Sequence, residues 1–177
     1  MTLYSRLIAT GLWLCCLGGP TGLVFAETIS HSQSFGALRI EAPFARASAS
    51  AAVKASAAYF TLTNTGTRPD RLIAVTGDMA RRVELHNIVQ TDGVMTMVRI
   101  EDGVPLAPGT SVVFEPGGMH VMMMGLHAPL IEGDMLTVTL VFEKAGATEI
   151  QIPIRKIGAK HHDSKRSRKM DHSKHGT

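Results

Sequence analysis

Short β-type segments bounded by turn residues run from about residue 38 to residue 157 and constrain the fold more than any other feature. Thr91-Asp92-Gly93-Val94 is a strong hairpin signal, because Asp-Gly readily takes the positive φ values of a tight turn. No strong helical period is present, although the alanine-rich residues 47–58 could hold a helical turn. We expect strands at residues 38–42, 57–63, 70–75, 82–87, 95–100, 111–114, 120–125, 136–143 and 149–154. Many short strands in a chain of this length favour an all-β antiparallel sandwich.

The first 26 residues have the composition of a secretory signal peptide. Arg6 precedes a largely apolar run at residues 7–17, and Ala26 is a small residue of the kind found before a cleavage site. The run is short for a membrane span. We therefore expect cleavage after Ala26, a periplasmic location and no stable membrane insertion of the mature protein. An uncleaved anchor, or lipidation at Cys15 or Cys16, is less favoured, since neither cysteine follows the small residue that lipidation requires.

Charge and cysteine content divide the chain and exclude several functions. Residues 27–158, the expected domain, contain 11 Lys and Arg against 13 Asp and Glu, whereas residues 159–177 contain six against two. The alkaline pI therefore reflects a polar basic tail, which we expect to be disordered, and nucleic-acid binding by the domain is not supported. Both cysteines lie in the signal peptide. The mature chain thus has no thiol, which excludes thiol–disulfide chemistry and disfavours a blue-copper electron carrier.

Two histidines and two methionines form the main candidate site. Ten residues separate His86 from Met97, twenty-two separate Met97 from His120, and one separates His120 from Met122. On a strand, His120 and Met122 point to the same face, which they share with Met124. Thioethers bind Cu(I) well and hard cations poorly, and imidazole also suits copper. If the four side chains converge, the expected metal is Cu(I).

A purely structural interpretation competes with this site, because methionine is a common filler of hydrophobic cores. Strand parity separates the two interpretations within one segment: Met123 points to the face opposite His120 and Met122, so we expect it in the core. By the same argument Val83 and Leu85 face the core, and His86 shares the opposite face with Glu84 or lies at the strand end.

The four residues and their flanks resemble the PCuAC family of periplasmic copper chaperones. That family has a His, ten residues, a Met, about twenty-one residues and then His-x-Met; here the middle gap is one residue longer, within an expected loop at residues 103–109. The resemblance covers roughly residues 38–156. Matching strings occur at residues 57–64 (AAYFTLTN), 83–86 (VELH), 93–97 (GVMTM) and 116–126 (PGGMHVMMMGL).

The resemblance implies a cupredoxin-like β-sandwich that binds Cu(I) near its surface through His86, Met97, His120 and Met122. It also implies delivery of copper towards the CuA site of cytochrome c oxidase, or into general periplasmic copper handling. The recipient would then be a protein such as an oxidase copper subunit. Since the mature chain cannot itself reduce a disulfide, a thiol-bearing co-chaperone could assist. Met95 and Met124 are outside the motif and are candidates for supporting positions or for the core.

The tail holds a second group of donors, and two interpretations of it stay open. Imidazole nitrogens on a flexible segment can assemble around Cu(II), and some PCuAC-family members resemble this chain in having such an extension. A solvated basic tail without metal is equally compatible. The candidate residues of this second copper site are His161, His162, Met170, His172 and His175.

Three classes of function follow from these observations. A copper carrier is favoured, and the alternative is a structural or adhesion-type β-sandwich with a Met-rich core and no metal role. An enzyme is disfavoured, because no Ser-His-Asp spacing or paired acidic site stands out. Four protein ligands on Cu(I) would also leave no open position for a substrate.

Overall fold

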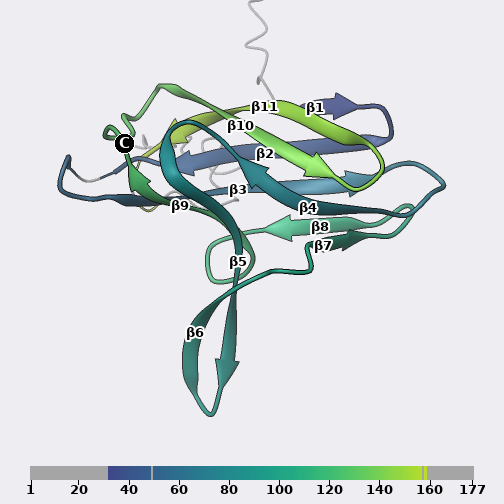
Figure 1. Ribbon diagram of the computed structural model, residues 1–177, viewed down its shortest axis with the longest axis horizontal. Coiled ribbons are helices and arrows are strands. Elements are labelled where there is room, and N and C mark those ends of the chain that lie inside the picture. Colours follow the sequence, from purple (N-terminus) through teal and green to yellow (C-terminus); the bar gives the residue numbers. More distant parts are fainter. Residues whose placement is uncertain (1–31, 49, 157, 159–177) are drawn as a thin grey trace, which may run out of the picture.

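The computed structural model describes residues 32–48, 50–156 and 158, in which every regular element is a β-strand (Figure 1). The strands are β1 (Ser32–Phe35), β2 (Leu38–Arg46), β3 (Ala55–Asn64), β4 (Asp70–Thr76), β5 (Ala80–Thr91), β6 (Val94–Arg99), β7 (Val104–Leu106), β8 (Ser111–Phe114), β9 (His120–Leu126), β10 (Met135–Phe142) and β11 (Gly146–Arg155). Within these residues nothing forms a helix long and apolar enough to span a bilayer. The expected signal peptide and tail lie outside the described residues.

All eleven strands belong to one mixed sheet that folds over a common core. The order is β6-β5-β9-β3-β2-β11-β10-β4-β7, with β1 paired to β2 and β8 paired to β3. All pairs are antiparallel except β2 and β11, which run parallel. This pair joins the two halves of the sheet, of which one runs from β6 to β2 in the strand order and the other from β11 to β7. Residues of both halves contribute to a single buried cluster. The predicted all-β, cupredoxin-like sandwich is confirmed, and the parallel pair is the one departure from an antiparallel arrangement.

Alternating side chains from the two halves build this core. Phe60 on β3 and Phe114 on β8 are fully buried, and their ring centroids lie 4.5 Å apart. Leu140 on β10 and Ile150 on β11 are equally buried in the other half. Burying each such side chain contributes about 1.5–3 kcal/mol, and together they offset the entropy of ordering the strands.

A β-bulge in β2 changes which face of the sheet its side chains occupy. Glu41 pairs with Thr61 and Phe44 pairs with Tyr59, so β2 carries one more residue than β3 between these pairs. The backbone at Ala42 has a φ of 49°, as expected of a local irregularity. As a result, Phe44 packs outside the main core, against Tyr59.

Two short strands and one boundary differ from the sequence-based expectation. Residues 32–35 precede the first expected strand and residues 104–106 lie in the expected loop at 103–109, yet they form β1 and β7. The described residues of the alanine-rich segment, 47–48 and 50–58, form no helical turn: β3 begins at Ala55, and residues 51–52 form a simple turn. Pairing of β3 with β2 and β9 satisfies backbone groups there, which outweighs the helical preference of alanine.

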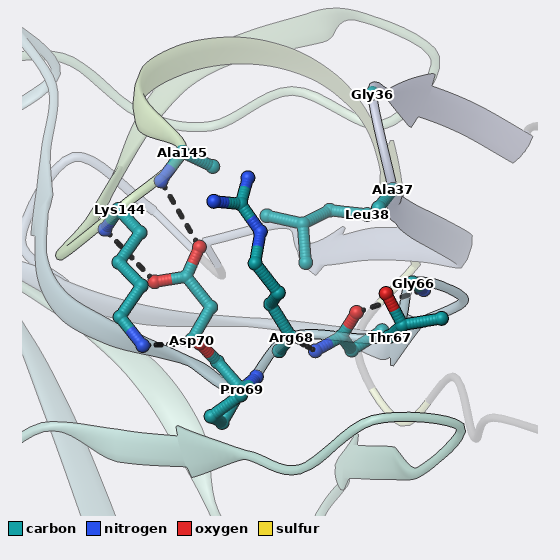
Figure 2. Close-up of a pocket in the computed structure, with 11 residues that line it drawn as sticks. Gly36, Ala37, Leu38, Gly66, Thr67, Arg68, Pro69, Asp70, Lys144 and Ala145 are labelled. Carbon is teal, nitrogen blue, oxygen red and sulfur yellow. Dashed lines mark hydrogen bonds between the residues drawn. The ribbon is translucent and has the colours of Figure 1, made fainter.

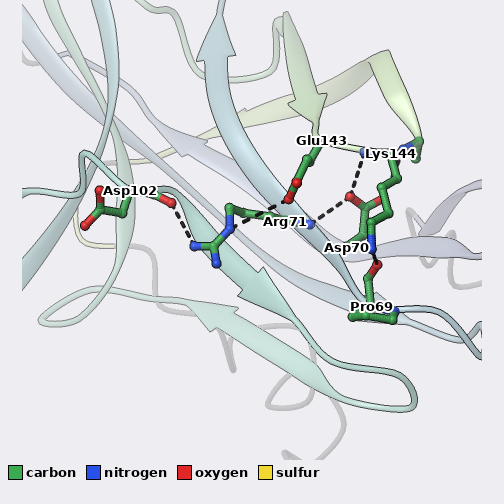
Figure 3. Close-up of polar contacts among 7 residues, drawn as sticks. Pro69, Asp70, Arg71, Asp102, Glu143 and Lys144 are labelled. Carbon is green, nitrogen blue, oxygen red and sulfur yellow. Dashed lines mark hydrogen bonds and ion pairs between the residues drawn. The ribbon is translucent and has the colours of Figure 1, made fainter.

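The C-terminal end of β3, which is its far end from the candidate site, lines a cavity of about 470 Å³. The cavity is also lined by the turn at Gly36, the loop through Arg68 and the turn at Ala145 (Figure 2). Asp70 fixes this end. Its carboxylate accepts hydrogen bonds from the backbone N–H groups of Arg71 at 2.7 Å and of Lys144 and Ala145 at 3.0 Å each (Figures 2 and 3). The Lys144 ammonium group donates to the Pro69 carbonyl at 2.7 Å. These bonds join the start of β4 to the β10–β11 turn.

Candidate metal centre

Cross-strand register brings the two candidate histidines together. β5 and β9 are antiparallel neighbours, and His86 lies directly opposite His120. Their ring centroids are 5.9 Å apart. Residues opposite one another in an antiparallel pair project from the same face of the sheet, so both imidazoles occupy one side.

The two candidate methionines lie on that same face. Met122 is two residues beyond His120 and stands opposite Glu84 on β5. Met97 on β6 stands opposite Ile88, which is two residues beyond His86. Because side chains alternate along a strand, each of these positions shares the face of the histidines. The register therefore places all four donors on one surface, reached from three adjacent strands.

This surface faces away from the main core. Leu85 and Val121, which alternate with the donors, are buried in the core, and Met123 is fully buried there. The expected core position of Met123, and the separation of Met122 from it, agree with the structure. Met97 is 47% exposed and Met122 is partly buried, so neither thioether is part of the core.

A groove of about 430 Å³ lies over this face, and three of the four candidates line it: Met97, His120 and Met122. His86 lies beside His120, with only 12% of its side chain exposed. The remaining wall includes Arg46, Ala47, Ala55, Ser56, Ala57, Tyr59, Ile88, Pro116 and Gly117. The groove thus brings His120 and both thioethers to one lined surface, with His86 next to His120.

His120 is held in one orientation with a free nitrogen. Its side chain is almost completely buried, and Nδ1 lies 3.0 Å from the Gly118 carbonyl oxygen. Because a carbonyl only accepts, Nδ1 carries the proton and Nε2 keeps its lone pair. Burial lowers the pKa of His120 below its ordinary value, with the Gly118 hydrogen bond opposing this effect and the nearby His86 and Arg46 adding to it. The ring is therefore neutral and can bind a metal at neutral pH.

Glu84 fixes the ring of His86 through a hydrogen bond to the other ring nitrogen, Nε2. That nitrogen is 3.0 Å from a Glu84 carboxylate oxygen, and Glu84 also pairs with Arg99 at 3.5 Å. The hydrogen bond from His86 lowers the pKa of Glu84, with nearby arginines adding to the effect and partial burial opposing it. Nδ1 of His86 is buried without a hydrogen-bond partner. An unsatisfied buried acceptor costs free energy, whereas a metal bound there would satisfy it.

The donor set suits a soft cation. Imidazole and thioether bind metals as uncharged ligands, which favours Cu(I) over hard divalent ions. The described residues contain no group of three or more His, Cys, Asp or Glu side chains that could hold a metal. A site in this part of the chain must therefore draw on the methionines.

Sequence reasoning missed the aromatic wall of the groove. The Tyr59 ring lies 6.4 Å from the His120 ring and 5.0 Å from Phe44, and the Arg46 guanidinium covers Tyr59 at 5.2 Å. Strand parity around Ala57 could have placed Tyr59 on this face, but its neighbours on β2 depend on the bulge.

The other candidates are not brought into the groove. Met95 is 59% exposed on β6, on the face of Met97, and Met124 follows Met122 on β9, with its sulfur 3.9 Å from an Arg82 nitrogen. His127, a histidine outside the motif, is exposed after β9. The five donors of the tail lie outside the described residues.

Comparison with known proteins agrees with this geometry. The sequence profile of a family described as "Putative lipoprotein LpqE-like" matches residues 38–154. The chain belongs to the LpqE-like family. A relative named "Putative lipoprotein Lxx21020", from Leifsonia xyli subsp. xyli (strain CTCB07), is 32% identical over 100 residues, which are 56% of this chain and 60% of the relative. The LpqE-like chain thus spans only about three fifths of that relative's length.

Solved structures with similar folds confirm the resemblance to PCuAC domains. The copper-bound PCuAC domain from PmoF2 is 31% identical with a TM-score of 0.60, and the match covers 72% of this LpqE-like chain and 99% of that domain. The apo PCuAC domain from PmoF1 is 30% identical with a TM-score of 0.60, and the match covers 72% of this chain and 100% of that domain.

Proposed function

We propose that this protein is an exported Cu(I) carrier that binds one ion through His86, Met97, His120 and Met122. The observation that carries the proposal is the hydrogen bonding of the two imidazoles. In each ring one nitrogen is hydrogen-bonded to an oxygen and the other is available to a metal, and the available Nδ1 of His86 is buried without a partner. The similarity to a PCuAC domain solved with copper bound supports the same metal.

X-ray absorption of the Cu(I)-loaded mature protein tests the ligand set. We expect both sulfur and nitrogen scatterers and a stoichiometry of about one Cu(I) per domain, as four donors for one soft ion predict. A spectrum with nitrogen and oxygen scatterers alone would exclude the methionines.

The open groove favours a carrier over an enzyme. Four protein donors saturate Cu(I) and leave no position for a substrate, while an exposed thioether such as Met97 can be displaced by a recipient's ligand. We infer a periplasmic location from the signal peptide, with Glu27 the first mature residue; the lipoprotein description of the family keeps an anchored form as the alternative. The domain limits 27–158 and the basic tail 159–177 are part of this proposal.

The recipient we propose is a copper protein such as the CuA subunit of cytochrome c oxidase. Because the mature chain has no cysteine, the recipient must already be reduced or be served by a thiol-bearing partner. Mixing the Cu(I)-loaded protein with a reduced, metal-free oxidase copper domain should move copper to that domain. Transfer that survives combined replacement of His120 and Met122 would assign the cargo to another site. If copper stays on this protein although the recipient binds Cu(I) more tightly, copper storage becomes the favoured function.

The competing function is a structural or adhesion-type sandwich whose methionines fill the core. The exposure of Met97 and the position of Met122 outside the core argue against it. A second proposal concerns the tail, whose His161, His162, Met170, His172 and His175 would bind Cu(II) independently of the groove.

A further inference from the structure

Four arginines lie on the face that carries the donors, and one of them, Arg46, lines the groove. Arg99 stands opposite His86, and Arg82 stands opposite Met124. Arg46 and Arg155 are paired neighbours on β2 and β11 at the other edge. Strand alternation directs Arg82 and Arg99 to the donor face. Arg46 and Arg155 are placed there by their stacking on Tyr59 at 5.2 Å and on Phe44 at 5.1 Å.

Few negative charges balance these guanidinium groups. Among the described residues of β5, β6 and β9, the strands that carry the donors, Glu84 is the single carboxylate. It is paired with His86 and Arg99. Asp92 and Glu115 lie in turns at the ends of the neighbouring strands. Arginine remains charged at any physiological pH. The groove face is therefore positive, although residues 27–158 as a whole contain more acidic than basic residues.

An apolar projection continues this positive face. The β5–β6 hairpin extends beyond the rest of the sheet (Figure 1), and all six residues of β6 are exposed. Val94 is 62% exposed and Met95 59% exposed. Exposed methionine and arginine next to apolar surface are typical of protein interfaces. The carboxylate of Asp92 at the hairpin tip disfavours insertion into an anionic bilayer, so the complement is better sought in a protein.

We propose that the groove face docks onto a carboxylate-rich protein surface surrounding a Cu(I)-accepting site. This proposal rests on the proposed copper function and adds the chemistry of the partner. The chain's own residues 159–177 carry an excess of positive charge and so do not complement this face. Attraction between opposite charges would orient the groove towards the acceptor before Cu(I) moves from thioether to acceptor ligand, with no change in oxidation state.

Two synthetic acceptor peptides test the docking. Both contain Cys-x-x-Cys, flanked by glutamates in one and by lysines in the other, and their association with the copper-free full chain is followed by fluorescence anisotropy. Transfer from the Cu(I)-loaded chain is followed by stopped flow at low and high salt. We expect the glutamate peptide to bind more tightly and to accept copper about ten-fold faster at low salt, with the difference largely lost in high salt.

A matched pair of charge reversals locates the effect. Arg82→Glu should remove most of the preference for the glutamate peptide, while Arg68→Glu should retain it, because Arg68 is an exposed arginine at the cavity on the far end of β3. Equal association and equal transfer with both peptides, or equal effects of both reversals, would overturn the docking proposal. So would tighter binding to phosphatidylglycerol vesicles than to the glutamate peptide. Selective association with the glutamate peptide in a chain that never takes up Cu(I) would retain the docking surface and reject the copper function.

Discussion

His86 and His120 differ in how their rings are fixed, and the difference has a thermodynamic consequence. Glu84 fixes His86 through Nε2, and the Gly118 carbonyl fixes His120 through Nδ1. Ring orientations that are set before metal binding reduce the entropy lost on binding. The thioethers of Met97 and Met122 have more rotational freedom and would adjust to the proposed Cu(I) ion.

Met122 and Met123 provide a neighbouring pair with opposite roles. Replacing Met122 with leucine should weaken Cu(I) binding at least about ten-fold, or about 1.4 kcal/mol, because a sulfur donor is lost from the groove. Met123→Leu conserves volume in the core and should leave the affinity nearly unchanged, at a stability cost below about 1.5 kcal/mol. Competition with a Cu(I) chelator measures the first effect and urea unfolding the second. Equal losses of affinity would show that the two side chains do not point to opposite faces.

Acid should destabilise the copper-free protein through His120. Burial holds the folded-state pKa of His120 below its ordinary value of about 6.5, so the unfolded chain takes up a proton first as the pH falls. Stability is therefore greatest above pH 6.5 and declines as the pH falls through that value towards the folded-state pKa.

Urea midpoints at pH 7.5 and pH 5.5 measure this decline. His120→Gln should show a smaller decline than the wild type, because Glu84, whose pKa is lowered from 4.5, titrates below this pH window and does not contribute to the decline. His127→Gln is the control, because His127 is exposed and outside the groove. A decline of the same size in His120→Gln and the wild type would contradict the assignment.

Strand parity could be predicted from the sequence around these residues, but their partners could not. The shared face of His120 and Met122, and the opposite face of Met123, follow from alternation alone. That His86 stands opposite His120 depends on the pairing of β5 with β9, two strands separated by β6, β7 and β8 in the chain. Glu84 was recognised as sharing a face with His86, whereas its bond to the ring required the folded side chains.

At the scale of elements, the β5–β6 hairpin controls the position of Met97. Its turn contains Gly93 with a φ of 81°, and Gly146 has the same φ of 81° in the β10–β11 turn; a Cβ at either position would meet nothing within 4 Å. Alanine at either glycine should therefore cost about 1 kcal/mol through backbone strain alone.

The two glycine variants should differ in copper binding. Gly93→Ala should lower Cu(I) affinity several-fold, since strain in the turn shifts the hairpin that carries Met97. Gly146→Ala should leave the affinity unchanged, because its hairpin lies in the other half of the sheet. Chelator competition on both proteins is the measurement. A similar loss in each would mean that general destabilisation, rather than hairpin geometry, governs the site.

The elements that sequence reasoning missed share weak local signals. β1 has the sequence SQSF and pairs with β2 alone, and β7 is the three-residue segment VPL at the end of the sheet order. Segments this short show too few alternations to establish a period, and proline argues against a strand except at an edge. Their structure comes from neighbouring strands that offer unpaired backbone groups.

At the scale of the whole molecule, a substitution far from the groove should lower stability without changing copper affinity. Asp70, at the far end of β3, accepts hydrogen bonds from three backbone N–H groups (Figures 2 and 3), and it is not among the residues that line the groove. Asp70→Ala should lower the free energy of unfolding by about 1–3 kcal/mol, because donors that it satisfied lose their partner. Cu(I) affinity at a temperature where the variant stays folded should match the wild type. A large loss of affinity would indicate that the two ends are coupled.

The tail should contribute Cu(II) capacity without contributing to the groove. Five His and Met donors occur within residues 161–175, in a segment with little apolar content. Deleting residues 159–177 should abolish Cu(II) binding and leave Cu(I) binding nearly intact, as measured by titration of both ions. Unchanged Cu(II) stoichiometry after the deletion would return the tail to a solvated basic segment.

The bulge in β2 has a consequence for how the length of this chain can vary. Because it supplies one residue more than β3 between Glu41 and Phe44, shortening the chain by one residue there would restore plain alternation and keep Phe44 on the groove side. The same deletion elsewhere in β2 would exchange inward and outward side chains along the rest of the strand. Single-residue gaps between natural relatives in this strand should therefore fall at residues 42–43.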